Sequence, residues 1–242
     1  MKNNLYNEDE ILFKKVNNMF ANSQYEYWIC HGTLLGIIRD NMILPWDHDI
    51  DFAVWKDEVS TDNIITLFKK NGFEQEHIFG EMDCLHFISN TKKVDVSFYE
   101  RKNGLASIKW IAPAKNLKDK ILEFIASRIC QPESVEDTKK DYGNIKSIFK
   151  YFFSKFLLSI EPIISLVIKK QIYKFVEKNF FYTGYSYPVE LMTFKRIKFL
   201  EDYIPVPIDA QKCLSLTYGN NWRIPKKDYI WYDEAKNLSR SK

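Results

Sequence analysis

Three carboxylic acids lie within five residues of this sequence, at Asp47, Asp49 and Asp51. Alternate side chains of an extended chain share a face, so Asp49 and Asp51 are expected side by side at the start of a strand, with Asp47 beside them. Crowded carboxylates repel one another, and a hard divalent cation relieves that repulsion. The spacing therefore predicts a Mg²⁺ site, with Mn²⁺ as the alternative, that handles a phosphate group. A structural role as turn residues or helix N-caps is the other reading, but acids interleaved with apolar Ile50 and Phe52 are costly unless they are used.

A fourth acid, Asp95, stands between two valines in the strand-like run KVDVSF. One acid in a strand can simply face solvent. If this strand pairs with the strand that carries Asp51, however, Asp95 becomes a further carboxylate of the same site, as a metal ligand or as a general base. His48 lies between two of the acids, and strand alternation turns its side chain to the opposite face, so we expect a structural role for it.

A glycine turn at Gly32 and Thr33 follows a strand-like run and precedes a helix-like one. The N-terminus of a helix offers free backbone N–H groups and a positive dipole end to a phosphate. Arg39 lies on the same predicted helix and could neutralise phosphate charge through two parallel hydrogen bonds. Its alternative is a surface ion pair with Asp40 or Asp57.

The elements that would carry these residues alternate over the first hundred positions. Helices are predicted at 8–22, 34–39 and 60–71, and strands at 25–29, 50–55, 77–79, 84–89 and 94–98. From about residue 114 the pattern is mainly helical, with helices predicted at 115–128, at 144–180 with a break at Pro162, and at 209–218. We therefore predict an α+β fold with a mixed β-sheet core, flanking helices and a helical C-terminal half. Residues 1–112 would form the catalytic core, and 113–242 a mainly helical region that completes the active site within one compact unit.

The segment 151–168, YFFSKFLLSIEPIISLVI, is apolar enough to raise a membrane interpretation. It contains Lys155, Glu161 and Pro162, and a charge at the bilayer centre costs about 2.5–3.5 kcal/mol, so spanning is not expected. Two alternatives remain: a buried core helix pair, and an interfacial helix in peripheral contact with the inner membrane surface.

The composition narrows the functional class and the compartment. The formal net charge is +3, an excess too weak for a dedicated nucleic-acid binder, so no nucleic-acid partner is expected. The four cysteines form no CxxC pair, which argues against a metal finger and favours reduced thiols in a cytoplasmic protein. The first ten residues are polar and acidic and contain no apolar core of a signal peptide.

Two motifs resemble a known family. The run GTLLGIIRDNMILPWDHDIDFAVW is similar to the LicD/fukutin signature, GTLLG-x-x-R followed by PWDxDID. The run LEDYIPVPIDAQKCLSLTYGNNWRIP, at 200–225, resembles the carboxy-terminal element of the same family, which ends in YGxxW-x-x-P. The resemblance covers roughly residues 25–100 and 195–226. The family often has Asp where this chain has His48, so an essential acid is not expected at that position.

The resemblance implies a fold like that of the DNA polymerase β-like nucleotidyltransferases. Its glycine turn would correspond to Gly32 and Thr33, its paired acids to Asp49 and Asp51, and its later single acid to Asp95. It also implies transfer of a substituted phosphate, of the phosphocholine or alditol (glycerol) phosphate type, from a CDP-linked donor to a glycan acceptor of lipopolysaccharide, capsule or teichoic acid.

The aromatic residues Tyr218, Trp222 and Trp46 are candidate stacking surfaces for the base or the sugar, with core packing as their alternative. Two other functions use the same sequence features. A true nucleotidyltransferase, moving NMP from an NTP, needs the same acids. A non-catalytic glycan-assembly module would keep the fold without using them.

Overall fold

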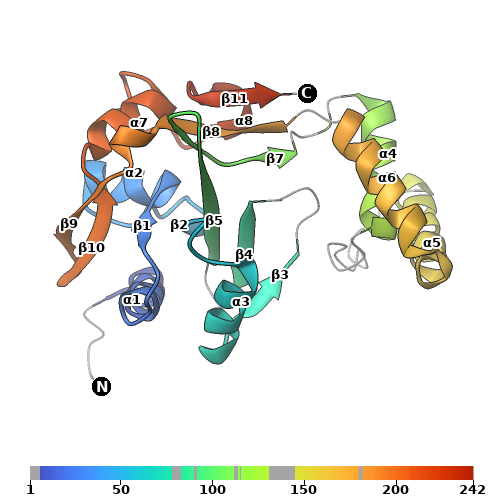
Figure 1. Cartoon of the computed structure of the whole chain (residues 1–242), viewed down its shortest axis with the longest axis horizontal. Helices are drawn as coiled ribbons and strands as arrows, with labels where there is room; N and C mark the ends of the chain where they lie inside the picture. Colours follow the sequence, from blue (N-terminus) through green and yellow to red (C-terminus); the bar gives the residue numbers. More distant parts are fainter. Residues whose placement is uncertain are drawn as a thin grey trace. The chain divides into compact units, whose positions relative to one another are not determined.

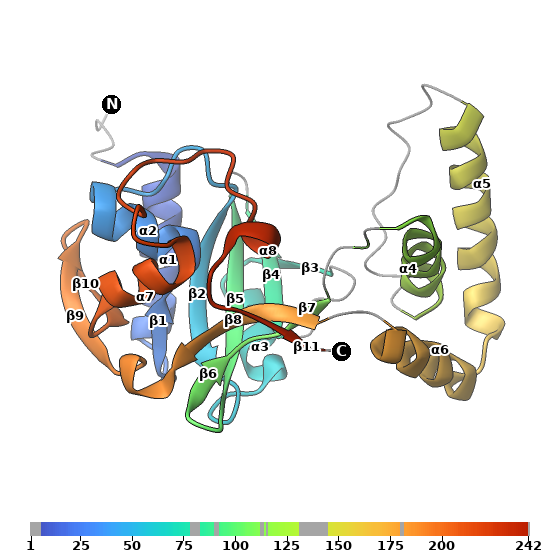
Figure 2. The ribbon, with the colours of Figure 1, turned by 90° about the horizontal axis from the view of Figure 1, so that it is seen from above.

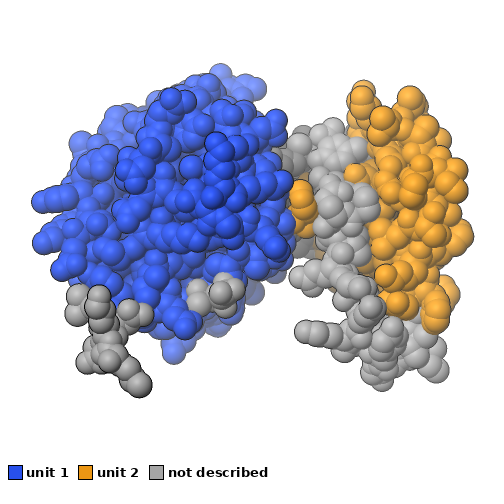
Figure 3. Space-filling view, turned by 90° about the horizontal axis from the view of Figure 1, so that it is seen from below, with its two compact units in different colours: residues 1–76, 82–110, 184–239 blue, residues 77–81, 111–183, 240–242 orange. Residues whose placement is uncertain are grey.

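The computed structural model describes residues 6–77, 83–89, 92–111, 114, 116–130, 145–179 and 182–241. Two compact units make up the chain (Figure 3): unit 1 comprises Met1–Glu76, Met82–Trp110 and Gly184–Ser239, and unit 2 comprises His77–Glu81, Ile111–Thr183 and Arg240–Lys242. The predicted boundary after residue 112 lies close to the point where the chain leaves unit 1. Residues 184–239, which the sequence pattern groups with the helical region, are part of unit 1.

The first half of the chain supplies the helices α1 (Glu8–Ala21), α2 (His31–Asp40) and α3 (Thr61–Lys70), and the strands β1 (Tyr27–Ile29), β2 (Asp49–Trp55), β3 (Glu74–Glu76), β4 (Cys84–Ile88), β5 (Lys93–Lys102), β6 (Leu105–Ser107) and β7 (Trp110–Ile111). The second half supplies α4 (Leu117–Cys130), α5 (Ile145–Ile160), the 3₁₀ turn η2 (Glu161–Ile163), α6 (Leu166–Asn179), β8 (Tyr182–Pro188), η3 (Val189–Leu191), β9 (Phe194–Phe199), β10 (Asp202–Pro207), α7 (Ala210–Tyr218), α8 (Trp231–Glu234) and β11 (Leu238–Ser241). Of the strand predicted at 77–79, His77 follows β3, and 78 and 79 lie outside the described residues.

The central sheet of the described residues has nine strands and runs in the order β1-β2-β5-β6-β8-β11, with β4 beside β5, β3 beside β4 and β7 beside β8 (Figure 1). Strands β2 and β5 are parallel, whereas β1, β4 and β6 pair antiparallel with their neighbours in this core. Strands β9 and β10 form a separate antiparallel pair. The α+β fold with a mixed sheet is therefore confirmed, and the C-terminal half contains strands as well as the predicted helices.

One face of the sheet is apolar and is covered by α1 and α3. Alternation in β2 turns Ile50, Phe52 and Val54 to this face, where each is fully buried. Phe13 of α1 stacks on Phe52 with ring centroids 5.7 Å apart, and Phe20 of α1 lies 5.4 Å from the same ring. The residues between these three in β2 therefore point to the opposite face.

That opposite face carries the candidate site at one end of β2 and an aromatic cluster at the other. Ala53 and Trp55 pack with Trp28 of β1, and the two indoles have ring centroids 4.7 Å apart. Helix α2 lies against β2, and α7 packs beside α2 (Figure 2). Helix α7 ends at Tyr218 and is capped by Gly219, whose φ of 82° is easily reached only by glycine.

Unit 2 is a helical unit in which α4 contacts α5, η2 and α6. The break that the sequence predicts at Pro162 is present as η2, since proline cannot continue the hydrogen-bond ladder of α5. Phe124 of α4 stacks on Phe153 of α5, and Arg128 donates to the hydroxyl of Ser154 at 2.7 Å. Among the described residues, no helix combines the length and the apolarity that crossing a membrane requires.

Candidate functional site

The three acids of the sequence motif converge on one point. Asp47, at the end of a loop, and Asp49 and Asp51, at the start of β2, place one carboxylate oxygen each within 4.8 Å of the others. Asp51 is buried, and the other two are partly exposed. Such a set of oxygens, open on one side, is the type of ligand cluster that a hard cation with waters and phosphates in its coordination shell requires.

Asp95 lies on the neighbouring strand, directly beside Asp51. The parallel register of β2 and β5 pairs Asp51 with Asp95, and adjacent strands lie about 4.8 Å apart, with paired side chains on one face. The antiparallel register of β5 and β4 then pairs Asp95 with His86. Three polar side chains therefore form a row across β2, β5 and β4.

Thr33, in the first turn of α2, holds Asp51 in place. Its backbone N–H and its hydroxyl both donate to Oδ2 of Asp51 at 3.2 Å, and the backbone N–H of Asp51 donates to the same hydroxyl at 2.8 Å. Thr33 is buried. Its contacts in the structure are therefore to a carboxylate, although the sequence pattern assigned it to a phosphate.

Gly32 provides the space in which the Asp47 carboxylate sits. A Cβ atom added at this glycine would lie 2.0 Å from Oδ2 of Asp47 and 3.6 Å from Oδ2 of Asp51. No side chain fits there unless Asp47 moves. Glycine at this position thus lets the N-terminal turn of α2 approach the acids closely.

The acids raise one another's proton affinity. Burial, followed by repulsion from Asp49, Asp47 and Asp95, raises the pKa of Asp51 well above its ordinary value, and the hydrogen bond from Thr33 opposes this shift. Burial and the adjacent Asp49 raise the pKa of Asp47 to about 7. This arrangement concentrates negative charge that bound protons or a bound cation would neutralise.

Lys92 is a buried cation that the sequence pattern did not single out. Its ammonium donates to the backbone carbonyl oxygens of Leu44, at 3.2 Å, and of Asp47, and it lies 3.5 Å from a carboxylate oxygen of Asp9 on α1. It fixes the loop that presents Asp47, and its charge also lowers the pKa of the Asp47 carboxyl. One lysine among many in a sequence gives no sign of such a role, because the role depends on the path of the loop.

His86 was also missed, although a signal for it exists. Its Nδ1 lies 2.8 Å from Oδ1 of Asp95, within hydrogen-bonding distance. In the sequence, His86 lies four residues before Asn90, and Asp95 lies four residues after Thr91. A tight hairpin centred on Asn90 and Thr91 would therefore pair His86 with Asp95 across the two predicted strands. Cys84, two residues earlier in β4, joins His86 and Asp95 in a second group whose potential ligand atoms lie within 4.8 Å of one another.

His31 opens α2 in a strained backbone conformation. Its φ of 49° lies in the left-handed region, which is uncommon for a residue other than glycine. Burial lowers the pKa of its imidazole to about 3, so the ring is neutral. Its Nε2 lies 3.4 Å from both the Ser97 hydroxyl and the Tyr99 hydroxyl. This strain sets the direction in which α2 begins, beside the acids.

Arg39 and His48 do not join the acid cluster through the described contacts. Arg39 lies in the last turn of α2, about 10 Å along the helix from Gly32. Its guanidinium pairs with the carboxylate of the adjacent Asp40, at 2.6 Å, which was one of the predicted alternatives. The side chain of His48 is exposed, while its carbonyl oxygen accepts a hydrogen bond from Lys93 and extends the ladder between β2 and β5.

The three candidate stacking residues differ in exposure. Trp222 is 5% exposed and packs in the core, with the Arg223 guanidinium 4.3 Å from its ring centroid. Tyr218, at the end of α7, is half-buried, and burial, Tyr185, Tyr187 and Asp51 raise its pKa well above the ordinary value. Trp46 is partly exposed and precedes Asp47. Core packing thus describes Trp222, whereas Tyr218 and Trp46 keep some surface.

Comparison with known families gives a match over residues 24–132 to the domain described as LicD/FKTN/FKRP, nucleotidyltransferase domain. An uncharacterized protein of Rickettsia typhi is 34% identical over 92 residues, which are 38% of this chain and 28% of that protein. Ribitol-5-phosphate transferase FKTN of Homo sapiens is 29% identical over 131 residues, covering 48% of this chain and 28% of that protein. The Mus musculus protein of the same name is 22% identical over 217 residues, covering 88% and 32%. The chain spans a third or less of the length of these relatives.

Among solved structures, the lincosamide antibiotic adenylyltransferase LnuA, in a lincomycin-bound crystal structure, is similar with a TM-score of 0.41 and 10% sequence identity. The similarity covers 86% of this chain and 84% of that one. A likeness of this size assigns neither a function nor a substrate.

Proposed function

We propose, from the match of residues 24–132 to the LicD/FKTN/FKRP nucleotidyltransferase domain, that the chain transfers a substituted phosphate from a CDP-linked donor to a sugar hydroxyl of a cell-surface glycan. The phosphate would be of the phosphocholine or alditol (glycerol) phosphate type. In the reaction, the acceptor oxygen forms a new bond to phosphorus, the bond to the CMP oxygen breaks, and CMP leaves. The similarity to ribitol-5-phosphate transferases supports a phosphate carried on a polyol.

The observation that carries this proposal is the convergence of four acids at the N-terminus of α2. Asp47, Asp49 and Asp51 offer oxygens within 4.8 Å of one another, and Asp95 is the cross-strand neighbour of Asp51. An oxygen-only ligand set fits Mg²⁺, or Mn²⁺ as the alternative. The raised pKa values of Asp47 and Asp51 fit the same cation, because its charge would offset the repulsion that raises them. When bound, the metal would neutralise the charge that develops on the phosphates during transfer.

The remaining residues position the reactants and move the proton. Gly32 lies in the first turn of α2, at the positive end of the helix dipole and beside the acids, so its backbone N–H would serve a donor phosphate. Thr33 fixes the orientation of Asp51 by hydrogen bonding. Asp95 takes the proton of the attacking hydroxyl, and His86 orients its carboxylate.

A second candidate, transfer of NMP from an NTP, uses the same acids and is favoured by the nucleotidyltransferase description of the matched domain. The two candidates release different products. The purified chain is incubated with Mg²⁺ and a panel of CDP-linked donors together with glycan acceptors, and separately with NTPs. Release of CMP from a CDP-linked donor supports the phosphotransferase. Release of pyrophosphate from an NTP, without CMP from any CDP-linked donor, would replace it with the second candidate. Asp51→Asn is the control in both assays.

A cytoplasmic location remains a prediction.

A further inference from the structure

Unit 2 exposes an unusual amount of apolar surface on α5, η2 and the start of α6. Six side chains form what we call the apolar stripe, and each is more than half exposed: Phe149, Phe152, Phe156, Ile163, Leu166 and Val167. Ile163, at the turn between the two helices, is 84% exposed. Exposed apolar side chains that gather on one helical hairpin in this way are typical of an interaction surface.

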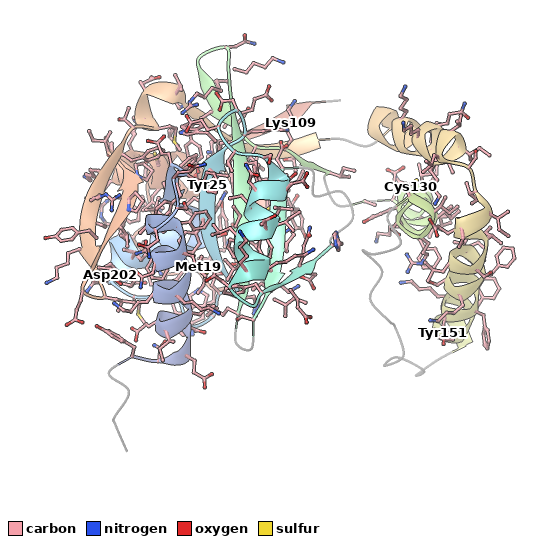
Figure 4. The ribbon with its side chains drawn as sticks, turned by 60° about the horizontal axis from the view of Figure 1, so that its bottom comes forward. Met19, Tyr25, Lys109, Cys130, Tyr151 and Asp202 are labelled. Atoms are coloured by element: carbon pink, nitrogen blue, oxygen red, sulfur yellow. The ribbon has the colours of Figure 1, made fainter. Side chains whose placement is uncertain are left out.

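The apolar stripe lies outside the face through which α5 packs against α4. On α5, Phe153, Ser154 and Leu157 face inward: Phe153 stacks on Phe124 of α4, Ser154 accepts a hydrogen bond from Arg128, and Leu157 is buried. The spacing of Phe149, Phe152 and Phe156 centres the stripe on a neighbouring face of α5, roughly 110° around the helix axis from these three residues, and Phe149 borders the packed face because its ring stacks on Phe153 at 6.2 Å. Figure 4 shows side chains projecting from α5, the helix that carries Tyr151, on the side away from α4.

The charged residues near the stripe lie mostly before and after it in the sequence. From Phe156 to Ile168 the sequence contains one charged residue, Glu161, and its carboxylate forms an ion pair with Lys169. Lysines stand on both sides of this apolar segment. We call these flanking cations the lysine collar: Lys155 on α5, and Lys170 and Lys174 on α6, whereas Lys150 lies over the Phe124 ring of α4 and Lys169 is paired with Glu161. The turn of the helical hairpin is thus apolar, and its two arms are basic.

We propose that this hairpin binds the surface of an anionic phospholipid bilayer, with the apolar stripe inserted among the acyl chains and the lysine collar against the headgroups. The apolar stripe matches the acyl chains, and the lysine collar matches the headgroups. A lysine side chain suits this boundary because its methylenes contact the apolar region while its ammonium reaches the headgroups. Each lysine near an anionic membrane strengthens binding about fivefold. A protein partner would account for the stripe but would not need lysines on both arms.

The proposal concerns the surface of unit 2 alone and does not depend on the phosphotransferase activity. It is tested by sedimenting the full chain with vesicles of phosphatidylcholine alone, and with vesicles that contain about 30% phosphatidylglycerol. No donor, acceptor or metal is added, so a failure here leaves the proposed activity untouched, and a failure of that activity leaves lipid binding untouched.

Three variants separate the contribution of the apolar stripe from that of the lysine collar and provide a control. Circular dichroism verifies the helix content of each. Phe152→Ser/Ile163→Ser should weaken binding to anionic vesicles by about tenfold or more. Lys170→Gln/Lys174→Gln should weaken it by about twentyfold, and high salt should have the same effect. Ile208→Ser is the matched control, because Ile208 is an isoleucine of unit 1 that is 52% exposed, and its loss should change nothing.

If the first variant alters helix content, Leu166→Ser/Val167→Ser, also within the stripe, provides a second test. Binding that requires anionic lipid, the stripe and the lysines supports the proposal. No binding to either vesicle, or binding that both stripe variants leave unchanged, overturns it. Self-association that is abolished by the stripe variants, without vesicle binding, would also overturn it and would make a second copy of the chain the occupant of the stripe.

Discussion

Gly32→Ala would perturb the acid cluster without altering a single acid. The added Cβ atom would lie 2.0 Å from Oδ2 of Asp47, whereas ordinary contacts begin near 3.4 Å. One of the two groups must therefore move by roughly 1.4 Å. A misplacement of about 1 Å in a site of this kind costs about 100-fold in rate, or roughly 2.7 kcal/mol of transition-state stabilisation.

Folding should be almost unaffected, because alanine in a helix is about 0.5–1 kcal/mol more favourable than glycine, which offsets part of the strain. The assay is a titration of Mn²⁺, followed by electron paramagnetic resonance, into the wild type, Gly32→Ala, Asp47→Ala and the double variant. We expect Gly32→Ala to weaken Mn²⁺ binding by at least tenfold in the presence of Asp47, and to have little further effect in the Asp47→Ala background.

Two results would refute this reasoning. Wild-type Mn²⁺ affinity in Gly32→Ala would show that Asp47 tolerates the added methyl group. An equal loss in both backgrounds would show that the glycine acts through something other than Asp47.

Three further predictions concern the surroundings of the acids. The pKa of Asp47 is raised to about 7, so in the metal-free protein this carboxyl should account for a loss of about 2 kcal/mol of stability, after allowance for solvent screening, as the pH rises from about 4 to about 7. Thermal unfolding against pH should show a loss to which Asp51 also contributes; Asp47→Asn should reduce this loss and Mg²⁺ should suppress it. His86→Ala should lower kcat about tenfold with little change in KM, and it should shift the pH profile of kcat. His86→Asn retains a hydrogen-bond donor toward Asp95, so it should restore part of the rate. Lys92→Met should cost about 1–3 kcal/mol in chemical unfolding because it leaves buried carbonyl oxygens without a donor; unchanged stability would contradict the role assigned to Lys92.

Much of this site follows from strand periodicity. The alternation of acids and apolar residues predicts both the buried face of β2, with Ile50 and Phe52, and the opposite face, with Asp49 and Asp51. Periodicity is local information, and one extended segment is enough to provide it. The helix breaks at Pro162 and Gly219 are predicted for the same reason, since each depends on the backbone of one residue.

Other features depend on contacts between distant segments. The position of Asp95 beside Asp51 requires β5 to lie parallel to β2, and family resemblance rather than periodicity indicated it. The hydrogen bond from Thr33 to Asp51 depends on how α2 packs against β2, which the sequence pattern does not reveal. Thr33 was therefore assigned to a phosphate and not to the carboxylate that it contacts. The strands β8 to β10 were left undefined because short runs that mix aromatic, charged and proline residues fit no single period.

The central claim is that these acids make phosphate transfer depend on a divalent cation. Its most direct test is the rate of CMP release from a CDP-linked donor, measured against Mg²⁺ concentration for the wild type, Asp51→Asn and His48→Ala. We expect release by the wild type to rise and saturate with Mg²⁺, to stop on chelation, to fall by at least 100-fold in Asp51→Asn, and to persist in His48→Ala, whose side chain points to solvent. Release at the wild-type rate by Asp51→Asn, or without any divalent cation, would contradict the claim.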